Sequence, residues 1–339
     1  MIDLFGYPPD QWLPFVFAGL MGLSILLYVV LDGYDLGVGI LTPLADDGDQ
    51  KDMMVASIGP FWDANETWLV LAVGMLLVAF PAAHGLILST LYLPVFILLV
   101  GLILRGVSFE FRVKARAKYK GLWNGLFFVG SLMATLAQGF MLGLYIMGLQ
   151  VTALTLVFAT LCALALVVGY AFIGSTWLIL KGEAKLQANA IRWAKNCIWG
   201  LVIGIGAISL ASPIVSPRIF DKWFAFPEML YLSPLPVLSL VLLAYLWRTL
   251  SQMPRPRDLD AWKPFVCALG LFTLAFLGLA YSFYPYVVPE KLTIYEAASA
   301  PESLLIILIG ACFVVPTILA YTALAYWVFR GKAKELRYD

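Results

Sequence analysis

The stretch FWDANETW, residues 61–68, decides how this sequence is interpreted, because it places polar groups inside an apolar segment. Two carboxylates and an amide lie between two tryptophans, two to three turns into a helix expected over residues 55–80. An ionisable group at membrane depth costs several kcal/mol, so it is usually paired, turned toward a bundle interior or placed along a hydrated path. The stretch therefore predicts the functional centre of an integral membrane protein.

The composition of the chain agrees with this interpretation, because 62% of its 339 residues are hydrophobic and only 13% are charged. A soluble domain has roughly 25% charged residues, and a net charge of +1 gives no sign of a nucleic-acid ligand. Windows of about 20 residues are long enough to span a bilayer. They lie near residues 14–41, 55–80, 84–108, 122–147, 152–180, 197–215, 229–248, 263–287 and 303–329. The sequence predicts an all-α, polytopic membrane protein with nine transmembrane helices.

Lysine and arginine gather on alternate loops between these windows. All of the 22 basic residues lie toward one side of the expected membrane except Arg218, Lys222 and Lys291. Because short loops rich in Lys and Arg stay in the cytoplasm, the pattern predicts an outer N-terminus and a cytoplasmic C-terminus. The first residues lack the basic start and the cleavage site of a signal peptide, so we expect the first helix to remain in the protein.

The chain is expected to divide in its own order into three segments. Residues 1–150 contain expected helices 1–4 and the membrane acids, residues 151–295 contain helices 5–8, and residues 296–339 contain helix 9 and a tail. This division predicts two four-helix bundles and one peripheral helix.

Expected helix 1 ends in a polar face. Asp32 and Asp35 are three residues apart and share this face with small and hydroxyl side chains, because residues three and four apart lie on one side of a helix. Three glycines among residues 33–39 indicate close approach by a neighbouring helix or a ligand. The alternative is that the two acids only mark the end of the helix at the membrane surface.

Expected helix 2 carries Asp63, Glu66 and Thr67 on one face, roughly 12–15 Å from its inner start. Carboxylates whose pKa is raised by desolvation can pass protons along a hydrated chain, so a proton path is one interpretation. The other is a structural ion pair, since one arginine can keep a buried carboxylate. Arg105 is the first basic residue of helix 3, and we expect it to contact Asp32, Asp35 or Asp63.

The sequence offers few groups for redox chemistry. Its single histidine, His84, lies in a short loop, and its four cysteines form no Cys-x-x-Cys pair. A haem needs axial ligands, which are most often histidines. We therefore expect this chain to bind no haem or other metal and to contribute no catalytic residue of its own.

Several motifs now resemble a known family. They are DGYDLGVG at 32–39, PFWDANETW at 60–68, RGVSFEFR at 105–112, LTIYEA at 292–297 and PTILAY at 316–321. In order and spacing they resemble subunit II of the cytochrome bd ubiquinol oxidases, and they cover both ends of the chain.

The resemblance implies a heterodimer in the bacterial inner membrane, in which subunit I carries two b haems, one d haem and the quinol site. Such a pair oxidises quinol at the outer face and reduces dioxygen to water with protons from the cytoplasm. The chain is short between helices 5 and 8, which looks more like the cyanide-insensitive branch. That branch often carries haem b in place of haem d, so the third haem is either d or b.

The resemblance also implies roles for particular residues. Four carboxylates line the cytoplasmic proton pathway: Asp63, Asp32, Asp35 and Glu66. Arg105 is their counter-charge, and Trp62 and Trp68 either pack against subunit I or border an apolar route for dioxygen. Whether a small accessory subunit joins the complex, and whether a structural quinone or a lipid sits among helices 1–4, stays open.

Two other classes of protein remain as alternatives. A proton-coupled secondary transporter would also show acids, glycines and an arginine in its helices, but it would carry a broken helix in each half. Helices 5–8 contain no charges that match those of helices 1–3. A purely structural membrane subunit is the third interpretation, and it predicts that neutralising the acids harms assembly alone.

Overall fold

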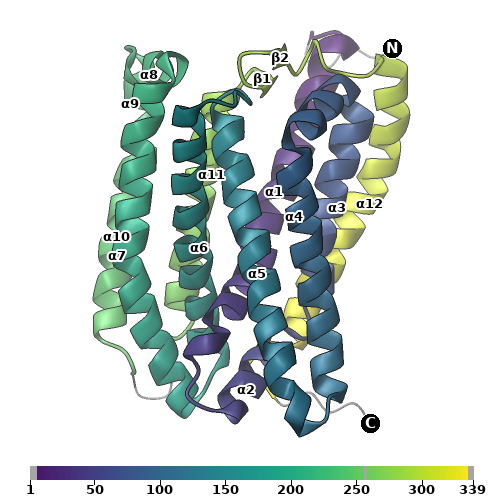
Figure 1. Cartoon of the computed structure of the whole chain (residues 1–339). Helices are drawn as coiled ribbons and strands as arrows, with labels where there is room; N and C mark the ends of the chain where they lie inside the picture. Colours follow the sequence, from purple (N-terminus) through teal and green to yellow (C-terminus); the bar gives the residue numbers. More distant parts are fainter. Residues whose placement is uncertain (1–5, 256–257, 335–339) are drawn as a thin grey trace. The chain divides into compact units, whose positions relative to one another are not determined.

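The computed structural model describes residues 6–255 and 258–334, without the side chains of residues 117 and 215, and is almost entirely helical (Figure 1). Its elements are α1 (Pro9–Leu41), the 3-10 helix η1 (Thr42–Leu44), α2 (Gly48–Ile58), α3 (Trp62–Ala79), α4 (Pro81–Lys114), α5 (Ala117–Ile146), α6 (Ala153–Lys181), α7 (Ala184–Val215), α8 (Pro217–Phe224), α9 (Glu228–Leu232), α10 (Pro234–Ser251), α11 (Lys263–Phe283), β1 (Tyr286–Val288), β2 (Leu292–Thr293) and α12 (Pro301–Val328). The two short strands pair antiparallel.

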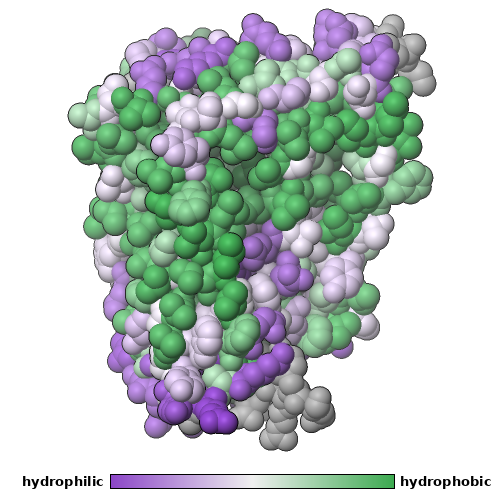
Figure 2. All heavy atoms as spheres, turned by 45° about the vertical axis from the view of Figure 1, so that its right-hand side comes forward, coloured by the Kyte–Doolittle hydropathy of each residue, from purple (hydrophilic) through white to green (hydrophobic). Residues whose placement is uncertain are grey.

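Nine helical segments in the described part of the chain are long and apolar enough to cross a membrane. The predicted all-α class and the nine candidate spans are therefore confirmed, while the direction in which the chain crosses stays a prediction. On the face that Figure 2 shows, hydrophobic side chains cover much of the middle and hydrophilic ones gather mainly toward the two ends. A surface with this distribution suits a hydrocarbon layer bounded by water.

The predicted single helix over 55–80 is wrong at its start. Two helices are present, α2 ending at Ile58 and α3 beginning at Trp62, with a turn at residues 59–61. Pro60 has no backbone N–H to donate, and its ring clashes with the carbonyl four residues earlier, so it interrupts a helix. The motif at 61–68 therefore opens α3 and does not lie turns inside a helix.

The chain forms two compact units that draw on segments far apart in the sequence. Unit 1 comprises Met1–Asp32, Pro60–Leu91 and Phe283–Arg330, and unit 2 comprises Gly33–Gly59, Tyr92–Ser282 and Gly331–Asp339. The division in chain order at residues 150 and 295, with its two four-helix bundles, is a different partition and stays a prediction.

Helix α4 contains a kink where one unit gives way to the other. Leu91 has non-helical backbone angles, φ −101° and ψ 16°. Pro94 follows inside the same helix, and proline removes a hydrogen bond and crowds the preceding turn. The kink therefore has a local cause in the sequence.

Unit 2 is built on close approaches between helices. A Cβ atom on Gly37 of α1 would lie 1.8 Å from the carbonyl oxygen of Tyr170 in α6, and one on Gly174 would lie 2.5 Å from the carbonyl carbon of Gly37. Lipid tails are as apolar as leucine, so helices in membranes associate by van der Waals packing, which small residues permit. Gly33 and Gly37 therefore serve contact between α1 and α6, whereas Gly39 faces Ser131 of α5.

Helices α4 and α5 meet in the same way. A Cβ on Gly130 would lie 2.7 Å from the backbone nitrogen of Arg105, and one on Gly101 would lie 2.8 Å from that of Ala134. The close backbone approach at Gly130 fixes the position of Arg105 relative to α5. It thereby sets the geometry from which the buried arginine reaches its partner.

Substituting Gly37 by alanine is expected to reduce the yield of folded protein strongly, because the added methyl group overlaps the Tyr170 carbonyl. Gly19→Ala in the same helix is the matched control, since a Cβ there meets nothing within 4 Å. Size-exclusion profiles and thermal unfolding in detergent measure the difference. Equal behaviour of the two variants would show that the α1 and α6 backbones are farther apart.

Candidate functional site

A buried ion pair joins α1 and α4 within unit 2. Arg105 Nη2 of α4 is 3.8 Å from Asp35 Oδ2 of α1, and the two side chains are 1% and 0% exposed. The sequence predicted that Arg105 contacts Asp32, Asp35 or Asp63, and Asp35 is now identified as one partner. A guanidinium keeps its charge in proteins and matches the shape of a carboxylate, so this pair holds two formal charges inside the helices.

Aromatic residues pack tightly beside the helix turn that carries Asp35. The ring of Tyr34 stacks on that of Trp177, with centroids 4.2 Å apart, and Phe265 packs edge-on against Tyr34. A Cβ on Gly33 would lie 2.8 Å from the ring of Tyr170. This packing restricts the turn of α1 around Asp35, so the carboxylate is held in place by its neighbours.

Asp32 lies one turn before Asp35 on α1 and is fully buried, at 0% exposure. Residues three apart share one face of a helix, so both carboxylates belong to the same face of α1. Burial of an acid in an apolar helix requires partners or water. The alternative in which these acids merely mark a helix end at the surface does not fit their burial.

The structure corrects the predicted depth of Asp63 and Glu66. Asp63 lies in the first turn of α3 and is exposed, and Glu66, one turn later, is half-buried. The start of a helix carries a partial positive charge, which favours a carboxylate there. Asp63 is therefore at the end of a span and not 12–15 Å inside it, because the helix begins at Trp62 after the turn at Pro60.

The two tryptophans of the motif differ in accessibility. Trp68 is 1% exposed and so lies inside this chain, whereas Trp62 is half-buried. The side chain of Trp62 is therefore accessible to another subunit, whereas that of Trp68 is covered by this chain itself. A role for either residue along a dioxygen route stays a prediction.

Sequence reasoning missed the residue that ties the motif to the rest of unit 1. Asn65 is 1% exposed; its amide donates to the carbonyl of Leu31, and its oxygen accepts from the hydroxyl of Tyr326. The ring of Tyr326 also stacks on Phe61, with centroids 4.6 Å apart. Asn65 thus joins α1, α3 and α12, and its position in the acidic motif gave the only hint of such a role.

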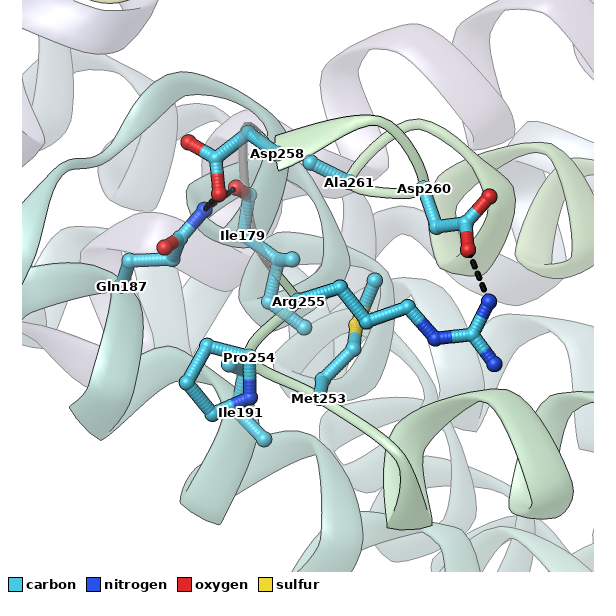
Figure 3. A pocket seen from close by; sticks show the side chains of 9 residues that line it. All are labelled: Ile179, Gln187, Ile191, Met253, Pro254, Arg255, Asp258, Asp260 and Ala261. Atoms are coloured by element: carbon cyan, nitrogen blue, oxygen red, sulfur yellow. Dashed lines mark hydrogen bonds and ion pairs between the residues drawn. The ribbon is translucent and has the colours of Figure 1, made fainter.

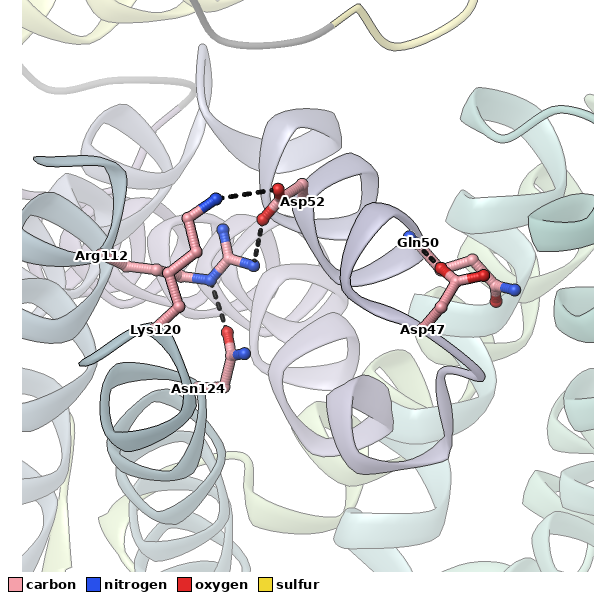
Figure 4. Close-up of polar contacts among 6 residues, drawn as sticks. All are labelled: Asp47, Gln50, Asp52, Arg112, Lys120 and Asn124. Carbon is pink, nitrogen blue, oxygen red and sulfur yellow. Dashed lines mark hydrogen bonds and ion pairs between the residues drawn. The ribbon is translucent and has the colours of Figure 1, made fainter. Parts of the chain in front are cut away.

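A second polar cluster lies beside α2 in unit 2 (Figure 4). Asp52 accepts from Arg112 at 2.6 Å and from Lys120 at 3.0 Å, and Arg112 also donates to Asn124. Burial acts to raise the pKa of Asp52, but the hydrogen bonds and charges of Lys120 and Arg112 outweigh it and lower this pKa. The cluster joins α2 to the end of α4 and the start of α5. In the sequence its only sign is a group of acids at residues 46–52 and a later group of bases at residues 112–120.

The described residues include no group of three or more His, Cys, Asp and Glu side chains arranged to hold a metal ion. His84 is partly exposed at the start of α4. The expectation that this chain binds no haem stays a prediction, supported by the lack of a second histidine in the sequence.

The whole of this helical region matches one known family. A sequence model described as cytochrome bd terminal oxidase subunit II aligns with residues 13–329. The chain belongs to this family. The match contains α1 with its buried acids, the motif at the start of α3 and Arg105 of α4, so the resemblance predicted from short motifs is confirmed over nearly the full sequence.

Two relatives align with this chain over most of its length. Cytochrome bd-I ubiquinol oxidase subunit 2 of Escherichia coli K12 is 26% identical over 365 aligned positions, covering 94% of this chain and 95% of the relative. Cytochrome bd ubiquinol oxidase subunit 2 of Bacillus subtilis is also 26% identical, covering 93% and 95%. The similarity therefore extends over both proteins from end to end.

A solved structure agrees with the fold. The bd oxidase of Geobacillus thermodenitrificans contains a chain that superposes with a TM-score of 0.76 at 16% identity, covering 94% of this chain and 99% of that one. At this identity the comparison supports the arrangement of helices alone.

Replacing Asp52 with asparagine is expected to remove an acid-sensitive part of the stability. Because its folded pKa is lowered, Asp52 contributes stability that is complete above its ordinary pKa of 3.8 and is lost as pH falls through the lower folded value. When the melting temperature is measured from pH 7 down to pH 3, it should therefore fall less steeply for Asp52→Asn than for the unmodified protein. The exposed Asp49 of the same helix provides the control Asp49→Asn, and equal slopes for the two variants would contradict the assignment.

Proposed function

We propose that this chain is the second subunit of a membrane-bound quinol oxidase that reduces dioxygen to water. The observation that carries the proposal is the family match across residues 13–329. Its relatives in Escherichia coli and Bacillus subtilis are both named as subunit 2 of a ubiquinol oxidase. Because the alignment covers 95% of each relative, it supports assigning the role of the whole subunit to this chain.

The proposed partner is a haem-bearing subunit I in the bacterial inner membrane. It would carry two b haems and a third haem of type d or b, together with the quinol site. One histidine in this sequence cannot supply the axial ligands of several haems, which favours placing them in the partner. Haem bound there would supply the electron transfer to dioxygen. An outer N-terminus and a cytoplasmic C-terminus belong to the same proposal.

The proposed contribution of this chain is to help move protons. Four acids of α1 and α3 are its candidates, as predicted: Asp32, Asp35, Asp63 and Glu66. Asp35 has Arg105 as its counter-charge at 3.8 Å. The exposed Asp63, at the end of a span, is suited to exchange protons with water.

Purification through an affinity tag on this chain, from its own membranes in mild detergent, tests the subunit assignment. We expect a haem-containing subunit to co-purify and the preparation to consume dioxygen when supplied with quinol. The reduced-minus-oxidised absorption spectrum then distinguishes a preparation with only b haems from one that also contains haem d. A colourless chain that purifies alone would contradict the assignment and favour the transporter.

The variant Asp63→Asn tests the proton role in that same complex. We expect slower quinol-driven oxygen uptake, by tenfold or more if Asp63 is the main entry group, with an unchanged haem spectrum. Asp10→Asn is the matched control, because Asp10 is likewise an exposed acid in the first turn of a spanning helix. Uptake equal to that of the unmodified complex at every pH would give Asp63 a structural role only.

A further inference from the structure

A hollow of about 330 Å³ lies between the start of α7 and the segment that follows α10, both within unit 2. Its described lining consists of Ala188, Ile191, Arg192, Lys195, Asn196, Met253 and Pro254. Figure 3 shows the smaller pocket beside it, which has room for roughly one water molecule and shares Ile191, Met253 and Pro254 with the hollow. The hollow thus combines apolar walls with two cationic side chains.

The charge of the described lining is positive. Arg192 and Lys195 line the hollow, and the lining residues that the structure describes include no carboxylate. Arg192 donates to Asn189 at 2.7 Å, and Asn189 in turn donates to Asp46 at 2.8 Å. This bridge fixes Arg192 on the surface of α7, and Lys195 lies three residues further along the same helix.

The acids of the neighbouring small pocket are engaged by other bases. Asp258 forms an ion pair with Lys332 at 2.9 Å, and Asp260 forms one with Lys263 at 2.6 Å. Asp260 also pairs with Arg255, so the negative charge of both acids is balanced by bases other than those of the hollow. Asp46 offsets part of the charge of Arg192, and with Lys195 the lining keeps a net positive charge that attracts an anion.

One helical turn beyond Lys195, α7 carries a tryptophan that contacts a tryptophan of α10. Trp199 of α7 and Trp247 of α10 pack edge to face, with ring centroids 5.3 Å apart, and they are 60% and 42% exposed. Trp199 is four residues after Lys195, a rise of about 6 Å along the helix. The exposed Arg248 follows Trp247 directly. Tryptophan collects at the level of lipid headgroups, so this order of bases and indoles marks a membrane surface.

We propose that the hollow binds the headgroup of one anionic phospholipid. Its phosphate lies against Arg192 and Lys195, and its acyl chains pass Trp199 and Trp247 along the exposed apolar surface of α7 and α10. Basic pockets between transmembrane helices bind such headgroups. None of the acids of α1 and α3 lines the hollow, and the proposal does not depend on the proposed oxidase activity.

A lipid fits this hollow better than a free anion does. Four of the lining residues, Ala188, Ile191, Met253 and Pro254, are apolar, and a small hydrated anion gains nothing from contact with them. Exposed apolar side chains also continue along α7 and α10, among them Ile203 at 69% and Val241 at 57%. A molecule with a charged head and apolar tails matches this sequence of surfaces.

The test uses the full chain, purified with the subunits that accompany it, stripped of lipid in detergent and titrated with phosphatidylglycerol under native mass spectrometry. We expect the double variant Arg192→Gln, Lys195→Gln to weaken the tightest binding event on the order of 30-fold. Each basic group near the membrane surface contributes about 1 kcal/mol, and a factor of ten corresponds to about 1.4 kcal/mol. The control variant Lys114→Gln, Lys118→Gln removes the same charge from exposed positions elsewhere and should leave that event unchanged.

Phosphatidylcholine and inorganic phosphate serve as the comparison probes. The proposal requires that phosphatidylcholine bind at least tenfold more weakly and that millimolar phosphate not displace the lipid. Equal binding by the two lipids, displacement by phosphate alone, or the same loss in the control variant would overturn it. Lys195→Gln alone leaves the bridge from Arg192 to Asn189 intact. If the double variant does not fold, a roughly fivefold loss in this single variant supports the site, and no loss overturns it.

Discussion

The ion pair between Asp35 and Arg105 is the interaction on which the rest of unit 2 depends. Two formal charges that are 1% exposed or less stand among apolar helices, and removing ions from water is strongly unfavourable unless they are well paired. The pair persists only while α1 and α4 are held at a fixed separation. Each of these helices is held by a glycine contact with another neighbour, α1 against α6 at Gly37 and α4 against α5 at Gly130.

This constraint connects the packing to the chemistry. Gly130 allows α5 to approach the backbone of Arg105 to within a distance that no side chain would tolerate, and Gly37 does the same for α1 and α6. Both contacts fix a helix turn that carries one member of the pair.

Much of the fold was predictable from the sequence, because long apolar windows have one stable form in a membrane, the helix. The nine spans followed from composition, and the place of Arg105 in the third expected helix predicted a contact with one of three acids, Asp32, Asp35 or Asp63. The break at Pro60 was missed, although proline gave a clear signal, because hydropathy runs on through it. That oversight placed Asp63 and Glu66 too deep.

Other features could not be predicted because they depend on tertiary contacts. The hydrogen bonds of Asn65 with Leu31 and Tyr326 join residues up to 261 positions apart, and no local pattern reveals such a pair. The same holds for the bridge from Arg192 through Asn189 to Asp46. The division into two units likewise follows from which helices touch, since each unit combines three separated segments.

A double-mutant cycle on Asp35 and Arg105 tests whether the buried ion pair stabilises unit 2. The free energy of unfolding is measured in detergent for Asp35→Asn, for Arg105→Met and for the two combined. Either single change should cost about 3–5 kcal/mol, because it removes one partner of a buried ion pair, and the combined change should cost clearly less than their sum. Additive costs would show that the two side chains are not coupled and would contradict the account.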